Sequence, residues 1–393
     1  MAEPWLTIIG IGEDGLAGLS EASRKALREA ETVFGGERHL ALVGVTGRGH
    51  PWPVPFDAEV VLGCRDRPTV VLASGDPFWH GAGASLAEKL EAGEWIAHSA
   101  PSTFSLAAAR LGWRLEAVAC LGLHAAPFER LVPHLAAGAR IICLVRDGKA
   151  AGDLAKWLSE RGWGASAFWS LTALGGPRES IAEHRADGLA GDLAGNLVAV
   201  AVEARGAQGI PRSAGLSDDL FAHDGQITKR PVRALAISAL APRPGERLWD
   251  IGAGSGSISV EWVLCGGTAT AIEMREDRTA NIRSNASAFG LAHRIAVVTG
   301  RAPEALAGLD APDAVFIGGG LDGAMFDAIW PLLAPGTRLV AHAVTLETEA
   351  LLGDLHQRHG GELMRVEIAH AGPLGRYRSW EAARPVVQWS AVR

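Results

Sequence analysis

Residues 249–257 read Trp-Asp-Ile-Gly-Ala-Gly-Ser-Gly-Ser, and they decide the fold of the second half of the chain. The apolar run 247–251 is typical of a buried strand, and 258–264 is typical of a helix. Glycine at every second position lets the backbone between them turn sharply and approach a ligand. Strand-like and helix-like runs alternate onward to residue 358, so we expect an α/β domain over 218–393. Residues 362–368 and 386–389 are predicted to pair as an antiparallel hairpin at its edge.

Polar residues around this glycine loop indicate the ligand. Glu273 ends the next predicted strand, about 20 residues after the loop, where a carboxylate can hold both hydroxyls of a ribose. A dinucleotide-binding loop requires its third glycine one position later, where Ser257 stands, and Asp250 would repel a pyrophosphate. Asp250 suits a cationic ligand. The pattern therefore favours S-adenosyl-L-methionine over a dinucleotide or a purely structural turn.

Candidate substrate contacts lie on either side of the loop. Lys229, Arg230 and Arg233 are three cations in five residues at the start of a predicted helix, which suits the binding of anions. His342 ends a predicted strand, at the sheet edge where ligands of such domains bind. A solvated loop and a hydrogen-bonded structural histidine are the alternatives for these residues.

The first half contains its own series of alternating runs. We expect strands at 5–11, 69–73, 140–145 and 196–202, and helices at 19–30, 103–111, 125–137 and 150–161. This alternation predicts a separate α/β domain over residues 1–205 with a largely parallel sheet. Residues 206–217 lack periodicity and are rich in Gly, Ala and Ser, so we expect a linker there.

Three motifs of the first half point to its ligand. Residues 10–15 (Gly-Ile-Gly-Glu-Asp-Gly) match the literal dinucleotide pattern, with Glu37 about 20 residues on. However, the two carboxylates inside that loop would repel a pyrophosphate. The stretch 74–83 begins Ser-Gly-Asp-Pro after a strand, and the turn 101–105 opens a helix. The last two motifs weigh against a dinucleotide site.

These motifs carry a family resemblance. The first half resembles the tetrapyrrole (corrin/porphyrin) methylases, and the second resembles the class I methyltransferases that are fused to them in cobalamin synthesis. The resemblance implies a two-lobed α/β domain followed by a Rossmann-like domain, each binding its own S-adenosyl-L-methionine. It further implies that the first domain methylates C5 of a precorrin. The second domain would methylate C15 and decarboxylate the C12 acetate arm.

The motifs and the resemblance together give the candidate cofactor contacts. In the first domain they are Gly10, Gly12, Gly75, Asp76, Pro77, Phe104 and Ser105. In the second they are Thr228, Asp250, Gly252, Ala253, Gly254, Ser255, Gly256, Glu273, Met274, Arg301 and Ala302. No catalytic nucleophile or metal ligand is expected, because the electron-rich macrocycle supplies the electrons and the protein aligns donor and acceptor.

Two positions depart from the family's pattern. The first loop carries Glu13-Asp14-Gly15 where the family often has Pro-Gly-Asp, which displaces the usual aspartate. His342 stands where we would expect an asparagine, so a polar contact is kept with a changed donor pattern.

Composition excludes several classes of protein. The net charge of −7 disfavours binding to nucleic acid or to an anionic membrane. The four cysteines form no C-x-x-C pair, so neither a zinc site nor a disulfide framework is indicated. We see no signal peptide and no apolar run of the roughly 18–20 residues that a membrane span needs. We therefore expect a cytoplasmic enzyme, and by resemblance a homo-oligomer.

Three other functions remain as alternatives. An RNA methyltransferase can use related folds, but the chain lacks a basic arm and the tetrapeptide often used to stack a flipped base. An NAD-dependent oxidoreductase would use the loop 10–15. A non-catalytic sensor of S-adenosyl-L-methionine would not need two intact cofactor loops.

Overall fold

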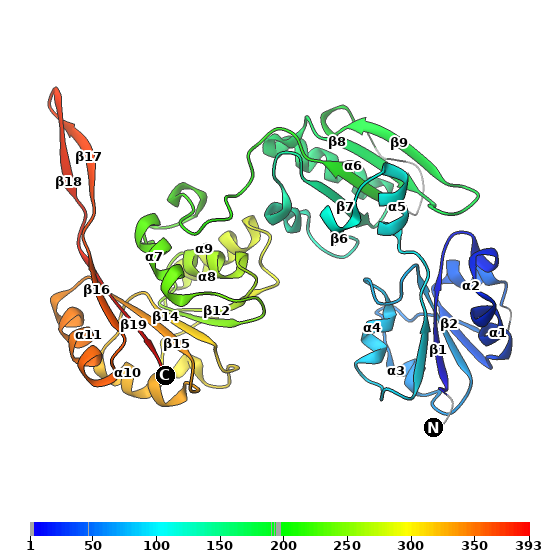
Figure 1. Ribbon diagram of the computed structural model, residues 1–393, viewed down its shortest axis with the longest axis horizontal. Coiled ribbons are helices and arrows are strands. Elements are labelled where there is room, and N and C mark those ends of the chain that lie inside the picture. Colours follow the sequence, from blue (N-terminus) through cyan, green and yellow to red (C-terminus); the bar gives the residue numbers. More distant parts are fainter. Residues whose placement is uncertain (1–3, 46, 190, 192, 194–197) are drawn as a thin grey trace. The chain divides into compact units, whose positions relative to one another are not determined.

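The computed structural model describes residues 4–45, 47–189, 191, 193 and 198–393 (Figure 1). The chain forms two compact units. The first comprises the residues up to Phe128 together with His134–Gln208, and the second comprises Glu129–Pro133 and Gly209–Arg393. Each unit has its own sheets and its own cores, and each is described by itself.

The first unit begins with a parallel five-stranded sheet in the order β3-β2-β4-β1-β5. Its strands are β1 (Leu6–Ile11), β2 (Thr32–Gly35), β3 (Gly49–Pro51), β4 (Thr69–Ser74) and β5 (Trp95–His98). Its helices are α1 (Glu21–Glu29), α2 (Glu37–Val43), α3 (Glu59–Leu62) and α4 (Ala82–Ala87). Helices α1 and α2 cover one face of the sheet and α3 and α4 cover the other, so β1 is apolar on both faces (Figure 1).

The second lobe of this unit is a mixed sheet in the order β6-β7-β10-β8-β9. Its strands are β6 (Val118–Gly122), β7 (Arg140–Val145), β8 (Ala167–Thr172), β9 (Ser180–Arg185) and β10 (Val198–Glu203). Helix α5 (Thr103–Leu111) packs its apolar side on one face, and α6 (Gly148–Leu158) is amphipathic with its buried side toward β7 and β10. The two-lobed α/β fold that the resemblance implied is confirmed.

Two expectations for this half need correction. The sheet is not largely parallel throughout, because β10 runs antiparallel to both β7 and β8, and β8 runs antiparallel to β9. The helix expected at 125–137 is a short 3₁₀ turn, Phe128–His134, which contains Pro133. Proline removes a backbone donor and so disfavours an α-helix there. The strand expected at 196–202 is present as β10 from Val198 on, and residues 196 and 197 lie outside the described part.

The second unit is a seven-stranded sheet in the order β13-β12-β11-β14-β15-β19-β16. Its strands are β11 (Arg247–Ile251), β12 (Thr268–Glu273), β13 (Ile295–Thr299), β14 (Ala314–Ile317), β15 (Arg338–Ala343), β16 (Glu362–Val366) and β19 (Val386–Val392). The first five strands are parallel, and β19 runs antiparallel to both of its neighbours. The carboxyl ends of β11–β15 therefore lie at one edge of the sheet.

Helices cover both faces of this sheet. They are α7 (Arg230–Leu240), α8 (Ser257–Leu264), α9 (Glu276–Ala288), α10 (Gly323–Ile329) and α11 (Leu346–His359). Helices α7–α9 pack on one face, and α10 and α11 pack on the other (Figure 1). This is the Rossmann-like arrangement that the sequence predicted for the second half.

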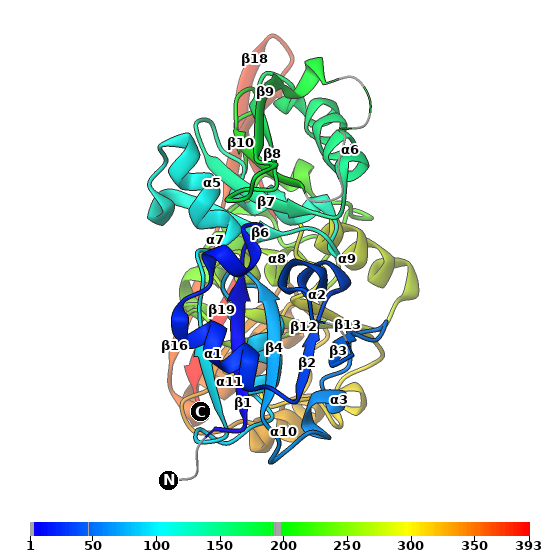
Figure 2. The same cartoon turned by 90° about the vertical axis from the view of Figure 1, so that its right-hand side faces the viewer.

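The predicted edge hairpin is present with an addition. β16 pairs with β19, but a second two-stranded ribbon, β17 (Ala369–Leu374) and β18 (Tyr377–Ala382), is inserted between them. This ribbon extends well beyond the seven-stranded sheet in both views of the unit (Figures 1 and 2). Its exposed residues include Leu374, Tyr377 and Trp380.

Across the described ranges, no helix is long and apolar enough to cross a lipid bilayer.

Candidate cofactor sites in the two domains

The glycine loop of the second domain adopts a backbone that only glycine accepts readily. Gly252, Gly254 and Gly256 have φ values of 69°, 58° and 71°. Three residues with left-handed backbone conformations therefore lie within the five residues 252–256, between β11 and α8. A side chain at Gly252 would also crowd Gly319, since its Cβ would lie 3.1 Å from the Gly319 carbonyl oxygen. The loops after β11 and β14 are therefore in close contact at the carboxyl edge.

Two buried polar atoms of this loop lack partners within the described residues. Asp250, at the end of β11, is fully buried, and its Oδ2 accepts hydrogen bonds from Ser259 N at 3.1 Å and Ser259 Oγ at 2.6 Å. Its Oδ1 and the hydroxyl of Ser255 have no hydrogen-bond partner there. Burial raises the pKa of Asp250 to about 6, opposed by the Ser259 hydrogen bonds. Unsatisfied buried polar atoms of this kind are typical of a ligand site.

Glu273, at the end of β12, connects that strand to the glycine loop through a hydrogen bond. Its Oε2 accepts from the Gly254 N–H at 3.0 Å, and its Oε1 accepts from the Arg275 N–H at 3.0 Å. The side chain is buried, and the backbone N–H of Gly300 donates to its carbonyl oxygen at 3.0 Å. The expected meeting of Glu273 with the glycine loop is thus present. Thr228, Met274 and Arg301 lie in loops that flank this edge, and Ala302 is buried beside them.

These residues fit S-adenosyl-L-methionine. A glycine cradle, a carboxylate at the end of β12 and a buried carboxylate with one unpaired oxygen match a ligand with ribose hydroxyls and cationic groups. Asp250 and Glu273 would hold it through polar groups, and the glycines would give it close backbone approach.

Arg233 does not face a ligand. It is fully buried, and its Nε donates to Glu261 at 2.5 Å while its Nη1 donates to Asp218 at 3.0 Å. Its Nη2 donates to the Leu216 carbonyl oxygen, and Glu261 accepts from the Leu216 N–H at 2.9 Å. Arg233 therefore fixes the chain around 216–218 to α8. The prediction that it binds substrate is wrong, and the end of the predicted linker packs within the second unit.

The other two cations remain exposed at the start of α7. Lys229 lies 3.8 Å from Asp218, a distance at which the pair is weak, and the Arg230 side chain is exposed. His342 is buried instead, with its Nε2 at 3.0 Å from Gln388 Oε1 and its ring edge-on to Phe316 at 5.0 Å. Burial lowers the pKa of His342, so the ring is neutral. It fits the structural alternative better than a substrate contact.

Large apolar side chains are exposed at the same edge. Met274 follows β12, and Val344 and Leu346 follow β15; their exposed fractions are 66%, 54% and 79%. Exposed apolar groups at the sheet edge that carries the glycine loop suit a flat, largely apolar ligand. Sequence reasoning did not identify this surface, although Met274 was predicted to contact the cofactor.

In the first domain the glycines pack backbone against backbone. A Cβ on Gly10 would overlap the Gly75 carbonyl oxygen and lie 2.6 Å from the Ala100 N. A Cβ on Gly75, whose φ is 57°, would lie 2.9 Å from the Ser102 Cα. The ends of β1, β4 and β5 therefore meet closely, which brings all three predicted motifs together. Gly12 is also confined, since its Cβ would lie 2.7 Å from Asp14 Oδ1.

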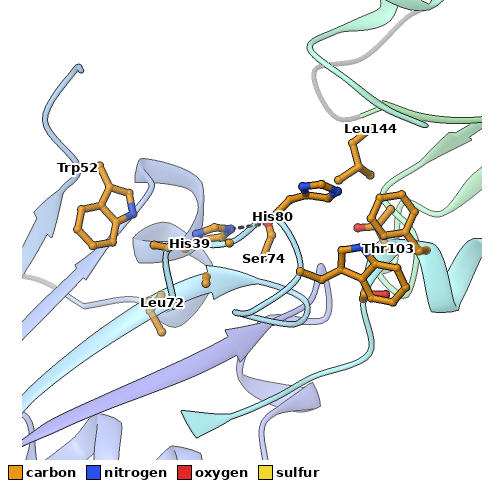
Figure 3. A pocket seen from close by; sticks show the side chains of 13 residues that line it. His39, Trp52, Leu72, Ser74, His80, Thr103 and Leu144 are labelled. Carbon is orange, nitrogen blue, oxygen red and sulfur yellow. Dashed lines mark hydrogen bonds between the residues drawn. The ribbon is translucent and has the colours of Figure 1, made fainter. Parts of the chain in front are cut away.

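A cavity of about 220 Å³ opens beside two of these motifs, 74–83 and 101–105 (Figure 3). Its lining includes Ser74, Trp79, Phe104 and, from the second lobe, Leu144. The rings of Trp79 and Phe104 lie 5.0 Å apart and form one wall. Asp76 and Pro77 belong to the loop that leads into it, where Asp76 Oδ1 accepts from the Phe78 N–H at 2.8 Å. Ser105 bonds to Ser102 at the start of α5.

The loop at 10–15 does not form a pyrophosphate site. Its Glu13 is buried and ion-paired with Arg38 and, at 3.4 Å, with Arg178 of the second lobe. The loop leads into a short 3₁₀ turn, Gly15–Gly18, rather than an α-helix whose N-terminus could bind phosphate. Glu13, which departs from the family's loop pattern, is therefore neutralised by ion pairs with two arginines.

The part of the chain that is described holds no group of three or more His, Cys, Asp and Glu side chains arranged to bind a metal ion.

Comparison with known proteins identifies the family of each half. The family model of the tetrapyrrole (corrin/porphyrin) methylases matches residues 5–190, and that of the precorrin methyltransferase domain matches 219–393. A decarboxylating precorrin-6Y C(5,15)-methyltransferase from Sinorhizobium sp is 49% identical, over 99% of this chain and 97% of that protein. The predicted resemblance is confirmed.

Two shorter proteins match part of the chain. A probable decarboxylating cobalt-precorrin-6B C(15)-methyltransferase from Pyrobaculum calidifontis is 38% identical over 44% of this chain and 92% of its own length. The solved C-terminal domain of precorrin-6Y C5,15-methyltransferase from Rhodobacter capsulatus is 59% identical, over 47% of this chain and 100% of that one, with a TM-score of 0.46. Since the Sinorhizobium relative spans nearly the whole of both sequences, the chain belongs to the family of decarboxylating precorrin-6Y C(5,15)-methyltransferases.

Proposed function

We propose that the two domains divide the reaction of this family. The first domain, residues 1–205, methylates C5 of the precorrin. The second domain, residues 218–393, methylates C15 and removes the carboxyl group of the C12 acetate arm, so that the product is precorrin-8x. Family membership itself makes the chain a decarboxylating methyltransferase of cobalamin biosynthesis that uses S-adenosyl-L-methionine, and it sets aside the RNA-methyltransferase and NAD alternatives.

One observation carries the division: each unit has its own candidate ligand site. In the first, the cavity lies at the carboxyl ends of the parallel strands. In the second, the loop of Gly252, Gly254 and Gly256 lies at the corresponding edge, with Glu273 bonded to it. The Pyrobaculum relative, whose name mentions C(15) alone, matches only 44% of the chain, which supports a separable C15 activity. We therefore propose one S-adenosyl-L-methionine per domain.

In both methylations the protein aligns the methyl donor with the macrocycle and binds the charged arms of the substrate. When bound, S-adenosyl-L-methionine supplies a methyl group activated by a sulfonium sulfur. In the second domain, Lys229 and Arg230 would bind carboxylate arms of the substrate, and Met274, Val344 and Leu346 would contact the face of the macrocycle. Such an apolar surface also disfavours a charged carboxylate held against it, which assists the loss of carbon dioxide.

A complementation experiment tests the division. Asp76→Asn keeps an oxygen for the Phe78 N–H but removes a charge from the first site, and Glu273→Gln removes a charge from the second. With a ¹³C-methyl donor, Asp76→Asn should lose the C5 label and Glu273→Gln the C15 label. Mixing the two variants should restore the doubly labelled, decarboxylated product. Failure of the mixture, with both variants folded, would contradict the division.

We also propose that the enzyme is a cytoplasmic homo-oligomer. The exposed apolar side chains of the β17–β18 ribbon support association, because large exposed apolar patches are typical of interaction surfaces. Light scattering coupled to size-exclusion chromatography measures the oligomeric state directly. A monomer at micromolar concentration would refute the proposal.

A further inference from the structure

Three side chains meet at the first-domain cavity, and two of them, His39 and Ser74, belong to its lining. Arg38 Nη2 lies 2.9 Å from Ser74 Oγ and 2.9 Å from His39 Nε2, and His39 Nε2 lies 2.9 Å from Ser74 Oγ. Arg38 and His39 begin α2, and Ser74 ends β4. Figure 3 shows His39 and Ser74 in contact at the cavity. None of the motifs discussed above assigns a role to this triangle.

The direction of its hydrogen bonds follows from the donors available. A guanidinium group only donates, so His39 Nε2 is the unprotonated, accepting nitrogen of the ring. Ser74 Oγ likewise accepts from Arg38, so its own hydrogen points to His39 Nε2, whose single lone pair is shared between Arg38 and Ser74. Because the Ser74 side chain is exposed and lines the cavity, its second lone pair is open to a ligand there.

The reaction requires a proton acceptor at this place. A bridging carbon that bears one hydrogen and gains a methyl group must release that hydrogen for the ring system to stay conjugated. We propose that Ser74 accepts the proton that leaves the methylated bridging carbon, and that His39 accepts the hydroxyl proton of Ser74 in the same step. This inference rests on the proposed assignment of C5 methylation to the first domain.

The step balances without any further reagent. The carbon–methyl bond forms as the sulfur–methyl bond breaks, and sulfur keeps that electron pair. The carbon–hydrogen bond then breaks, and its electron pair returns to the conjugated macrocycle. The proton passes to Ser74 Oγ, and the Ser74 proton passes to His39 Nε2, which later releases it to solvent.

A weak base is adequate for this step. After methyl transfer the macrocycle carries the positive charge, so the adjacent carbon–hydrogen bond is strongly acidic. Burial, and secondly the charge of Arg38, lowers the pKa of His39 to about 4. His39 therefore stays unprotonated, and able to accept, throughout the neutral range.

Two charged residues near His39 act in opposite directions. Arg38 lies beside it on α2 and disfavours its protonation, whereas Glu13, after β1, offsets part of the Arg38 charge through its ion pair. Arg178 reaches the same carboxylate from the second lobe, and His80 lines the cavity from the loop after β4. Glu13 thus acts as a positioning residue that fixes the Arg38 guanidinium between Ser74 and His39.

Two variants and one control test the proposal on the full-length enzyme. His39→Gln keeps an acceptor for Arg38 but cannot take a proton, and Ser74→Ala removes the hydroxyl group. His50→Gln is the matched control, since His50 lies on β3 of the same sheet, is exposed and is not part of the cavity lining; its ring is tilted against Phe34, with the ring centroids 5.5 Å apart. Each is assayed for C5 methylation with substrate bearing hydrogen or deuterium at C5, and for S-adenosylhomocysteine binding by calorimetry.

We expect kcat for C5 methylation to fall about 100-fold in both variants, as is usual for loss of a proton-transfer group. A deuterium isotope effect should appear or grow in both, because proton loss becomes slower. Binding of S-adenosylhomocysteine should change less than about threefold, because the methyl donor is held elsewhere. His50→Gln should match the unaltered enzyme. A proton NMR titration of the unliganded protein should show His39 titrating well below the ordinary histidine range.

Three results would overturn the inference. They are C5 rates within about twofold of the unaltered enzyme in both variants, a loss confined to KM, and a loss of kcat without an isotope effect. Failure of the proposed function has a different signature. In that case Asp76→Asn would retain C5 methylation, whatever the behaviour of His39→Gln.

Discussion

The two glycine loops of this protein look alike in sequence, but their glycines have different structural roles. In the second domain, Gly252, Gly254 and Gly256 all take positive φ values and form an open cradle with unsatisfied polar atoms. In the first domain, Gly10 lies inside β1 and is required because the Gly75 backbone occupies the space of a side chain. A glycine pattern therefore reports close backbone approach, and only the surroundings show whether a ligand or another strand makes that approach.

The cavity of the first domain is built from other residues. Aromatic rings of Trp79 and Phe104 and the polar triangle of Arg38, His39 and Ser74 line or border it. The second site is instead formed by consecutive loops at one sheet edge. The four predictions below separate packing glycines from ligand-binding ones and one site from the other.

Alanine substitutions at a packing glycine and at a loop glycine should differ most in their effect on stability. Gly10→Ala forces a Cβ into the backbone of Gly75, just after β4, and should destabilise the first domain by on the order of 3 kcal/mol or more. Gly254→Ala has open space, with the nearest atom 3.5 Å from the new Cβ, and costs about 1–2 kcal/mol of backbone strain. Differential scanning calorimetry checks both. A Gly10→Ala chain with an unchanged first-domain transition would refute the packing role.

The cofactor carboxylate should give the next largest effect. Glu273→Gln keeps one acceptor but replaces the other with a donor that faces a backbone N–H. We expect the affinity of the second site for S-adenosylhomocysteine to fall about 10–100-fold, as for loss of a charge-assisted hydrogen bond. Calorimetry should show the first site unchanged. An equal loss at both sites would show that they are not independent.

Replacing Asp250 should raise the stability of the second domain and weaken its binding of the cofactor. Its folded pKa of about 6 lies above the ordinary value of 3.8, so its contribution to stability is present at low pH and is lost as pH rises through about 6. Asp250→Asn removes the buried charge and should stabilise the second domain by about 1–3 kcal/mol at pH 7.5, and by less at pH 4.5. Thermal unfolding at the two pH values measures this.

The same variant should bind S-adenosylhomocysteine more weakly, because the amide cannot pair with a cationic group. A variant with equal stability at both pH values and full affinity would contradict the role given to the unpaired oxygen of Asp250.

The exposed cations should give the smallest effect. Replacing Lys229 and Arg230 together by alanine should raise KM for the precorrin about 3–10-fold with kcat nearly unchanged, because exposed pairs are screened by solvent. High salt should shrink the difference. Arg243→Ala is the control, since Arg243 is exposed but precedes β11, at the opposite edge of the sheet. An unchanged KM in the double variant would remove these cations from the substrate site.

The second domain was readily predictable from its sequence. Its strands are short apolar runs, and the glycine loop and Glu273 lie on consecutive strands, so their meeting follows from parallel pairing of β11 and β12. The β17–β18 ribbon was missed because its residues are mostly exposed, and because β17 consists largely of small residues and contains Gly372 and Pro373. It has little of the apolar alternation by which a strand is recognised.

The error at Arg233 could have been avoided. Residues 233, 236, 237 and 240 follow the spacing of one helix face, and the last three are apolar. That spacing places Arg233 on the buried side of α7 and leaves Arg230 outside. The clustering of cations in sequence was misleading, since neighbours along a helix point in different directions.

The polar triangle of the first domain could not have been predicted. It joins Ser74, which ends a strand, to Arg38 and His39 on a helix that the sequence did not indicate, and its partner Glu13 reaches Arg178, 165 residues away. Such contacts depend on lobe packing, which local patterns do not contain.

Calorimetric titration of the full-length protein with S-adenosylhomocysteine, alongside a fragment that begins at Gly209, tests the central claim most directly. Two independent cofactor sites predict two binding events in the whole chain and one in the fragment, with Glu273→Gln weakening the event that the two share. A single binding event in the whole chain would contradict the claim. If Glu273→Gln abolished that single event, the first domain would have no cofactor of its own.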